Sequence, residues 1–255
     1  MKMKKTTLPL LLCLAAVLFA ACCRGDAVVS VSGTCFEVTA ALAAAPDAAT
    51  QAIVDEYRQR VIDIQAPVLG YAPVAIERGR PEGMLNNFEA DALRESGSAV
   101  LGKPVDVAVA NYGGIRNSWP QGDITVGDVN RAFPFENCLF LMTLTGSQLM
   151  QLFAAIAHSY GHPISGAHLV IDADGNLITA DVQGRPVDYA ATYTVATLDY
   201  LAEGNDGLDV LREGQDRRCL DEMTMRQIVT DRIMALTAAG KPIESPLDGR
   251  IEIIE

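Results

Sequence analysis

The sequence predicts an α+β domain in which helices pack on a mixed β-sheet. Segments with helical spacing and segments with strand-like alternation intermix along the chain, without the regular strand–helix–strand order of a parallel α/β fold. Apolar residues make up 49% of the 255 residues, so the chain can bury a core of domain size. No Pro/Ser-rich linker, low-complexity stretch or internal repeat interrupts it between Val28 and Ile254. We therefore expect one domain over residues 22–255.

The first half of the chain is expected to alternate between strands and helices. Short strand-like runs lie at Val28–Val31 and Cys35–Thr39. A long helix is expected to begin at Asp47, because apolar side chains then recur at near-helical spacing. These side chains are Ile53, Val54, Tyr57, Val61, Ile62 and Ile64. The next expected elements are a strand at Leu69–Ile76, a helix at Met84–Leu93, a strand at Val105–Ala110 and a short helix at Thr125–Phe133.

The sequence of the second half of the chain predicts further strands and two helices. A buried strand at Leu139–Leu144 precedes an amphipathic helix that opens at Gly146. The apolar face of that helix carries Leu149, Leu152, Phe153 and Ile156. Turn signals then separate the remaining elements, which are strands at Leu169–Ile171, Leu177–Val182 and Tyr193–Leu198, a helix at Met223–Leu236 and a strand at Arg250–Ile254.

The N-terminus has the features of a secretory signal. Three lysines precede an apolar run that is too short to span a bilayer, and small residues then lead to Cys22. The segment Phe19–Cys22 is typical of a bacterial lipoprotein cleavage site, which makes Cys22 the lipidated residue after removal of residues 1–21. Ordinary signal-peptidase cleavage nearby is the alternative. We expect an exported protein anchored to a membrane by its N-terminus.

The net charge and the spacing of the cysteines argue against two classes of function, nucleic-acid binding and zinc binding. Loss of the three signal lysines leaves 17 basic against 32 acidic residues, a net charge of −15, which argues against a nucleic-acid polymer as partner. The cysteines after Cys22 have no zinc-site spacing. Cys138 is expected to be a small buried apolar residue. Export permits a disulfide between Cys35 and Cys219, which the sequence leaves open.

A glycine pair followed by an arginine is the first candidate for a binding site. Asn111–Arg116 reads NYGGIR and follows an apolar run. Glycines let the backbone approach a ligand closely, and the arginine offers a planar charged fork for an anion or the edge of a base. A simple turn between a strand and the next segment is the alternative.

Five motifs in one order resemble the C-terminal domain of the 5'-nucleotidase family. They read NYGGIR, GDITVGDV, FPFEN, LTGSQL and EGNDG. The family blocks read roughly NGGGIR, GDIT-x-x-D, PFGN, LTG-x-x-L and a GGDG loop. The resemblance runs from about Arg78 to Ile253, and it implies the same α+β fold.

The resemblance implies a site for a nucleoside or nucleotide. Its two stacking aromatics correspond to Phe135 and Tyr200, and the ribose-binding aspartate corresponds to Asp206. Asn111 and Arg116 come from NYGGIR, and Asn137 would contact the edge of the base.

A further family arginine corresponds to Arg78 or Arg80, because the segment after it, Leu85–Ala92, matches the family pattern LGN-x-x-x-DA. Asn86 replaces the glycine of that pattern, and Asn205 replaces a glycine of GGDG, so Asn205 is expected to take a glycine-like backbone.

Each of these residues has a structural alternative. Phe135 could fill the core, Tyr200 could lie at the rim of the sheet, Asp206 could stabilise a turn, and Arg116 could form a surface salt bridge.

No catalytic or metal-binding residue is predicted in this chain. In the resembled family, hydrolysis belongs to a separate N-terminal domain with two metal ions. Its motifs of the DxH, GNHE and GHxH kind are absent, and only His158, His162 and His168 are present. The divalent metal pair is therefore expected on a catalytic partner, and the chain is not expected to be active alone.

Three hypotheses follow for the function. In the first, the chain is the nucleotide-recognition part of a split 5'-nucleotidase whose metallophosphatase is a separate protein. In the second, it is a non-catalytic lipoprotein that binds nucleosides at the surface. In the third, it is a structural domain without a ligand.

Overall fold

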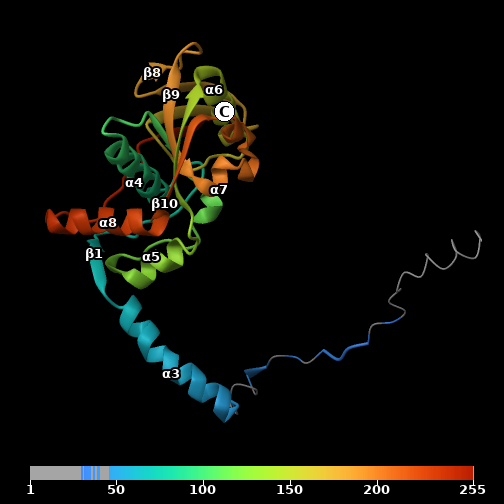
Figure 1. Cartoon of the computed structure of the whole chain (residues 1–255), viewed down its shortest axis with the longest axis vertical. Coiled ribbons are helices and arrows are strands. Elements are labelled where there is room, and N and C mark those ends of the chain that lie inside the picture. The colour runs from blue at the N-terminus through green and yellow to red at the C-terminus, as the bar shows by residue number, and fades with distance from the viewer. Residues whose placement is uncertain (1–29, 31, 36, 38, 41–45, 255) are drawn as a thin grey trace, which may run out of the picture. The chain divides into compact units, whose positions relative to one another are not determined.

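The computed structural model describes residues 30, 32–35, 37, 39–40 and 46–254 (Figure 1). The chain divides into two units between Ala52 and Ile53, and all the sheets lie in the second unit. Among the N-terminal residues that are described, Ser30, Cys35, Glu37 and Thr39 are not in a strand. The other residues of the two strands expected before position 40 lie outside the described residues, as do Cys22 and the signal segment.

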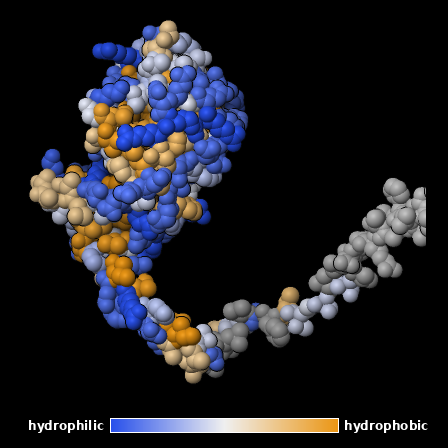
Figure 2. Space-filling view, viewed as in Figure 1, coloured by the Kyte–Doolittle hydropathy of each residue, from blue (hydrophilic) through white to orange (hydrophobic). Residues whose placement is uncertain are grey.

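The first long helix, α3 (Ala48–Gln65), is highly exposed. It begins where the sequence predicts, since the Asp47 carboxylate accepts a hydrogen bond from the backbone N–H of Thr50 at 2.8 Å. None of its residues is buried. The expected apolar side chains are at the surface, and Figure 2 shows hydrophobic atoms along this segment. The helical pattern is therefore confirmed, whereas its apolar side chains lack a buried environment.

A five-stranded mixed sheet forms the centre of the second unit. Its strands follow the order β10–β4–β9–β2–β5, with β10 at Gln215–Thr224, β4 at Cys138–Thr145, β9 at Thr192–Leu198, β2 at Val107–Val109 and β5 at Ile164–Ser165. The pair β2–β9 is parallel and the other three pairs are antiparallel. This mixture confirms the α+β class.

Two smaller sheets complete the fold. One pairs β1 (Val68–Ala72) with β3 (Gly122–Thr125). The other has the order β11–β6–β7–β8. Its strands are β11 at Ile251–Ile254, β6 at Ala167–Asp172, β7 at Leu177–Val182 and β8 at Arg185–Pro186.

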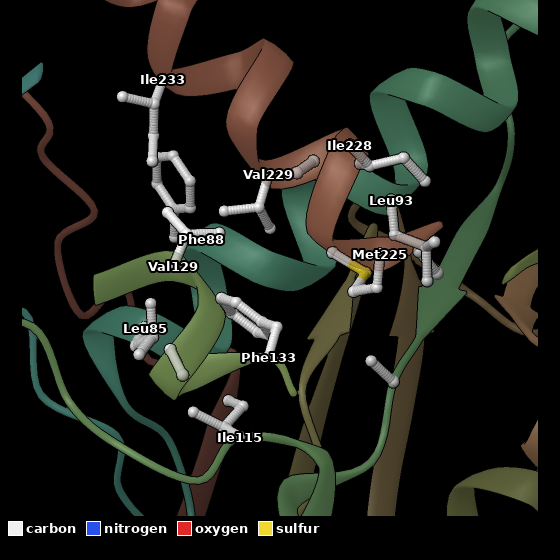
Figure 3. Packing of buried hydrophobic residues seen from close by; sticks show 14 of the residues in the cluster. Leu85, Phe88, Leu93, Ile115, Val129, Phe133, Met225, Ile228, Val229 and Ile233 are labelled. Atoms are coloured by element: carbon white, nitrogen blue, oxygen red, sulfur yellow. The ribbon is translucent and has the colours of Figure 1, made fainter. Parts of the chain in front are cut away.

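Three helices and the large sheet enclose one of two hydrophobic cores. The helices are α4 (Met84–Leu101), α5 (Val126–Ala132) and α8 (Met225–Ala238). Figure 3 shows their side chains in one cluster. Within this cluster Trp119 makes edge contacts with Phe88 and Phe133, with ring centroids 5.4 and 6.1 Å apart. Such contacts fix the rings relative to one another.

The second core lies on the opposite face of the sheet. Successive residues of a strand point to opposite faces, so Ala108 of β2 belongs to the first core while Val107 and Val109 belong to the second. Helix α6 (Gly146–His158) covers this second face with the four apolar residues expected from its sequence. The sheet is thus buried on both faces.

Several expected boundaries need correction. Helix α4 continues to Leu101 rather than ending at Leu93, and the strand expected at Leu69–Ile76 ends at Ala72. Strand β10 is absent from the prediction, because its residues are mostly exposed and polar and give no apolar pattern.

The cysteines also differ from one expectation. Cys138 is only half-buried, and its thiol donates a hydrogen bond to the backbone oxygen of Asp221 at 3.3 Å. Cys35 and Cys219 are both free and exposed, and they belong to different units of the chain.

Within the described ranges, no helix is both long enough and apolar enough to cross a membrane.

Candidate functional site

The topology brings three segments to one edge of the large sheet. Strands β2 and β9 are parallel, so their carboxyl ends lie at the same edge. Strand β4 is antiparallel to β9, with Leu139 paired with Leu198, so β4 begins at that edge. The residues after β2, before β4 and after β9 therefore converge. Such an edge is a common position for ligand sites in α/β sheets.

These segments surround a cavity of about 280 Å³. Six of the eight predicted binding residues line it, together with Gly113. The six are Asn111, Arg116, Phe135, Asn137, Tyr200 and Asp206. They come from the three segments named above, which are far apart in the sequence. The structure thus brings together residues that the sequence linked only by motif.

Asp206 is the centre of the hydrogen bonds in this cavity. Its Oδ2 accepts a hydrogen bond from the Asn111 amide at 2.8 Å, and its Oδ1 accepts one from the Tyr200 hydroxyl at 3.0 Å. The Tyr200 bond raises the pKa of that phenol. Both carboxylate oxygens are therefore held in fixed directions on the cavity wall. This is more than the turn-stabilising role considered as the alternative.

The backbone of the Asp206 loop differs from expectation. Asp206 itself has a left-handed backbone, with φ of 56°, between Gly204 and Gly207, which also have positive φ. Asn205 does not, so the expectation that Asn205 takes a glycine-like conformation is wrong. Its side-chain amide instead donates a hydrogen bond to the Tyr200 carbonyl at 2.7 Å. This bond ties the loop to the short helix α7 (Asp199–Ala202), which carries Tyr200.

Two aromatic rings line the cavity and remain exposed. Phe135 is 47% exposed and Tyr200 is 40% exposed. The alternative that Phe135 fills the core is wrong, because Phe133 occupies that position and is 3% exposed. An exposed phenylalanine on a cavity wall provides a flat apolar surface for a ligand.

Arg116 adds a positive charge to the same wall. Its guanidinium carbon lies 5.8 Å from the centre of the Phe135 ring, and its Nη1 donates to the Gly113 carbonyl at 3.1 Å. These contacts are with a ring and a carbonyl rather than with a carboxylate. The described contacts therefore do not support a surface salt bridge, and the remaining donors of Arg116 are available to a ligand.

The other two predicted arginines lie outside this cavity. The guanidinium carbons of Arg78 and Arg80 lie 4.4 and 4.5 Å from the centre of the Tyr112 ring. Arg78 also donates to the carbonyl of Ile115, and Arg80 donates to the carbonyl of Ser159. Both arginines thus pack on one aromatic ring next to Asn111, and their contribution to binding stays a prediction.

His162 is a residue that the sequence did not mark for this site. It is 3% exposed, and its Nδ1 accepts a hydrogen bond from the backbone N–H of Tyr112 at 3.3 Å. Burial, together with the nearby charge of Arg80, lowers the pKa of His162 to about 4. A neutral imidazole therefore supports the loop that carries Asn111. Only its proximity to Asn111 in space could have revealed it.

Over the part of the chain that is described, no three His, Cys, Asp or Glu side chains gather closely enough to hold a metal ion. The chemistry of the cavity is that of stacking surfaces, amides, one carboxylate and one guanidinium.

Comparison with known proteins identifies the family. The family model described as "5'-nucleotidase, C-terminal domain" matches residues 67–213. The chain belongs to this family. The match includes every lining residue of the cavity, so the cavity is part of a 5'-nucleotidase C-terminal domain.

Two curated relatives illustrate the similarity. The trifunctional nucleotide phosphoesterase protein YfkN of Bacillus subtilis is 27% identical over 224 residues, which cover 78% of this chain and 15% of that protein. Protein UshA of Escherichia coli is 31% identical over 166 residues, which cover 58% of this chain and 30% of that protein. The chain thus spans less than a third of the length of either relative.

Solved structures share the fold. The 5'-nucleotidase precursor of Thermus thermophilus matches with a TM-score of 0.70 and 28% identity over 81% of this chain and 43% of that one. The Haemophilus influenzae NAD nucleotidase matches with a TM-score of 0.59 over 81% of this chain and 41% of that one, and at 17% identity it shows the fold alone.

Proposed function

We propose that this chain binds the nucleoside part of a nucleotide in the cavity at the edge of the large sheet. The observation that carries the proposal is the position of two exposed rings, Phe135 and Tyr200, on a cavity whose wall also holds Asp206. A base is a flat π surface that stacks on aromatic side chains. A ribose offers hydroxyl donors that a fixed carboxylate can accept.

The remaining groups fit the other parts of such a ligand. The Asn137 amide can both donate to and accept from the edge of a base. Arg116, with its guanidinium beside the Phe135 ring, can bind an anion such as a phosphate. Because the net charge of the whole chain is −12, an anionic ligand must rely on such a local cation.

We propose further that hydrolysis is completed by a metallophosphatase on a separate chain, which would supply a divalent metal pair. Family membership supports pairing with a metallophosphatase domain, and the separate chain is our proposal. A one-to-one complex with a metallophosphatase that hydrolyses nucleotides, while this chain alone does not, is the expected result. A complex without activity towards any nucleotide would contradict it.

Isothermal titration of adenosine into the purified protein tests the binding site. We expect saturable binding that falls at least tenfold in Asp206→Ala, because the variant removes the proposed ribose acceptor. Asp209→Ala is the matched control, because Asp209 is an exposed acid three residues away that pairs with Arg212 and does not line the cavity. It should bind like the wild type.

Two other results would be informative. Absence of heat at millimolar adenosine, AMP and uridine would contradict nucleoside binding by this chain alone. Equal affinity in Asp206→Ala and the wild type would place the ligand elsewhere.

The place of the protein in the cell is a proposal of the same kind. We propose that it is an exported lipoprotein anchored through Cys22. The wild type should partition with membranes, and Cys22→Ala should not be lipidated, whereas Cys23→Ala should behave like the wild type. Mass spectrometry of the N-terminal peptide distinguishes these outcomes, and an unmodified Cys22 in the wild type would contradict the proposal.

A further inference from the structure

Helix α4 places a carboxylic acid in the core behind the cavity of about 280 Å³ described above. That cavity is called the ligand cavity below. Glu89 is 1% exposed, and its Oε2 has no hydrogen-bond partner among the described residues. Burial raises the pKa of this carboxyl well above its usual value. A neutral carboxylic acid carries one O–H donor beside a carbonyl acceptor.

The side chain of Glu89 lines a second, much smaller cavity. This cavity measures about 10 Å³, which is close to the room that a single water molecule needs. Its other lining residues are Gly114, Phe133, Phe135, Asn137, Leu198 and Met225. Apart from Asn137, these residues have apolar side chains, and Gly114 has no side chain.

The small cavity adjoins the ligand cavity. Phe135 and Asn137 line both, and Gly114 and Leu198 are close in sequence to Gly113 and Tyr200 of the ligand cavity. The carboxylic acid therefore lies behind the wall where the base would stack. Its Oε2 makes no hydrogen bond with any described residue, and an apolar side chain in this environment would avoid burying an unpartnered oxygen.

We propose that Glu89 determines base specificity, by hydrogen bonding through one water molecule to the substituent at C6 of a purine. This inference rests on the proposed nucleoside binding. An amino group at C6 can donate to the water, which then donates to the carbonyl oxygen of Glu89. A 6-oxo group can accept from the same water, which then accepts from the carboxyl O–H. A purine without a substituent at C6 leaves that water with one partner fewer.

Adenosine and purine riboside, which differ only in the amino group at C6, provide the test. Their affinities for the full chain are measured by isothermal titration in the wild type, Glu89→Gln and Glu89→Leu. We expect the wild type to bind adenosine about five to ten times more tightly, the range of one net hydrogen bond. Glu89→Leu should reduce that ratio to within twofold while its affinity for purine riboside stays unchanged. Glu89→Gln keeps a donor and an acceptor and should keep most of the ratio.

Two controls separate specificity from folding. Glu95→Leu changes an exposed acid of the same helix α4 that lines neither the small cavity nor the ligand cavity, and it should leave the ratio as in the wild type. Thermal unfolding of Glu89→Leu should show a melting temperature equal to or above that of the wild type, because the unpartnered oxygen is gone. If Glu89→Leu does not fold, loss of the ratio in Glu89→Gln would contradict the inference.

The outcomes also separate this inference from the proposed function. An unchanged ratio in a folded Glu89→Leu that still binds adenosine overturns the role of Glu89 alone. A wild type that binds neither nucleoside overturns both. A ratio near one in the wild type means that the substituent at C6 is not recognised, and overturns the inference while nucleoside binding stands.

Discussion

At the scale of single residues, two hydrogen bonds fix the carboxylate of Asp206 on the cavity wall. Asn111 and Tyr200 hold the two carboxylate oxygens in different directions. Asn111 is buried whereas Asp206 is exposed, so the hydrogen bond between them is partly shielded from water. The Tyr200 hydroxyl is on an exposed ring, so a ribose hydroxyl can displace it at little cost. The two bonds are therefore expected to play different parts when a ligand binds.

The first prediction separates the ring of Tyr200 from its hydroxyl. Tyr200→Phe keeps the stacking surface and frees one oxygen of Asp206, so adenosine should bind at least as tightly as to the wild type. Tyr200→Ala removes a stacking surface worth roughly 1–3 kcal/mol, so affinity should fall by about 5- to 150-fold. Isothermal titration measures both. Equal losses in the two variants would mean that the hydroxyl, not the ring, carries the contribution.

The second prediction concerns the buried imidazole of His162. Its pKa in the folded state is about 4, against about 6.5 in the unfolded chain. Between these values the unfolded state binds more protons, so the free energy of unfolding falls as pH falls. The contribution of His162 should thus decrease by roughly 2–3 kcal/mol from pH 7 to pH 4.5.

Urea unfolding of His162→Asn at the two pH values measures this contribution. The asparagine keeps an acceptor for the N–H of Tyr112 but does not titrate, so the variant should lose less stability than the wild type on acidification. His158→Asn changes an exposed histidine at the end of α6 and should follow the wild type. Identical pH dependence in all three proteins would contradict a neutral buried His162.

At the scale of elements, the sequence predicts best where local signals and packing agree. Helix α6 has an apolar face and a capping box between Thr145 and Gln148, and its position was predicted closely. Strand β10 was missed because pairing with β4, rather than an apolar pattern of its own, makes it a strand. Such pairing depends on contacts distant in sequence, which local patterns do not contain.

The candidate site likewise contains residues that the sequence predicts and residues that it does not. The order of the family motifs predicts the six residues that line the ligand cavity, because each motif forms a loop that the sequence specifies locally. His162 and the proposed contribution of Glu89 have no local signature, since one is a lone histidine in a loop and the other a lone acid in a helix. Arg78 and Arg80 were assigned without a fixed register, and only the structure places both against the Tyr112 ring.

The third prediction tests the cap of helix α5, which precedes the loop of Phe135. The Thr125 hydroxyl accepts from the backbone N–H of Asp128 at 3.2 Å, and the Asp128 carboxylate accepts from the backbone N–H of Thr125 at 2.9 Å. Thr125→Ala removes half of this capping box and should lower the free energy of unfolding by about 1 kcal/mol. Thr125→Ser keeps the hydroxyl and should lose less. Urea unfolding measures the two losses of stability, with the slope of the free energy of unfolding against urea concentration expected to stay unchanged. Equal losses in the two variants would mean that the methyl group of Thr125, not its hydroxyl, accounts for the effect.

At the scale of the whole molecule, one sheet separates two cores and couples them. Side chains on the two faces alternate along β4, where Leu141 belongs to the first core and Phe140 and Met142 belong to the second. Loss of packing on one face therefore changes the support of the sheet for the other. The cavity lies at the edge of this sheet, so both cores also fix its walls.

The final prediction is that the two cores unfold together. Phe153 is fully buried in the second core, on the opposite face from Trp119. Phe153→Ala should lower the free energy of unfolding by about 3–5 kcal/mol through lost contacts and a cavity. Trp119 is the one tryptophan of the chain, so its fluorescence reports the first core alone, while far-UV circular dichroism reports all helices and strands. If the sheet couples the cores, the urea midpoints from both probes shift by the same amount. A shift in circular dichroism with an unchanged fluorescence midpoint would mean that the two faces unfold independently, and the edge cavity would then be supported by the first core alone.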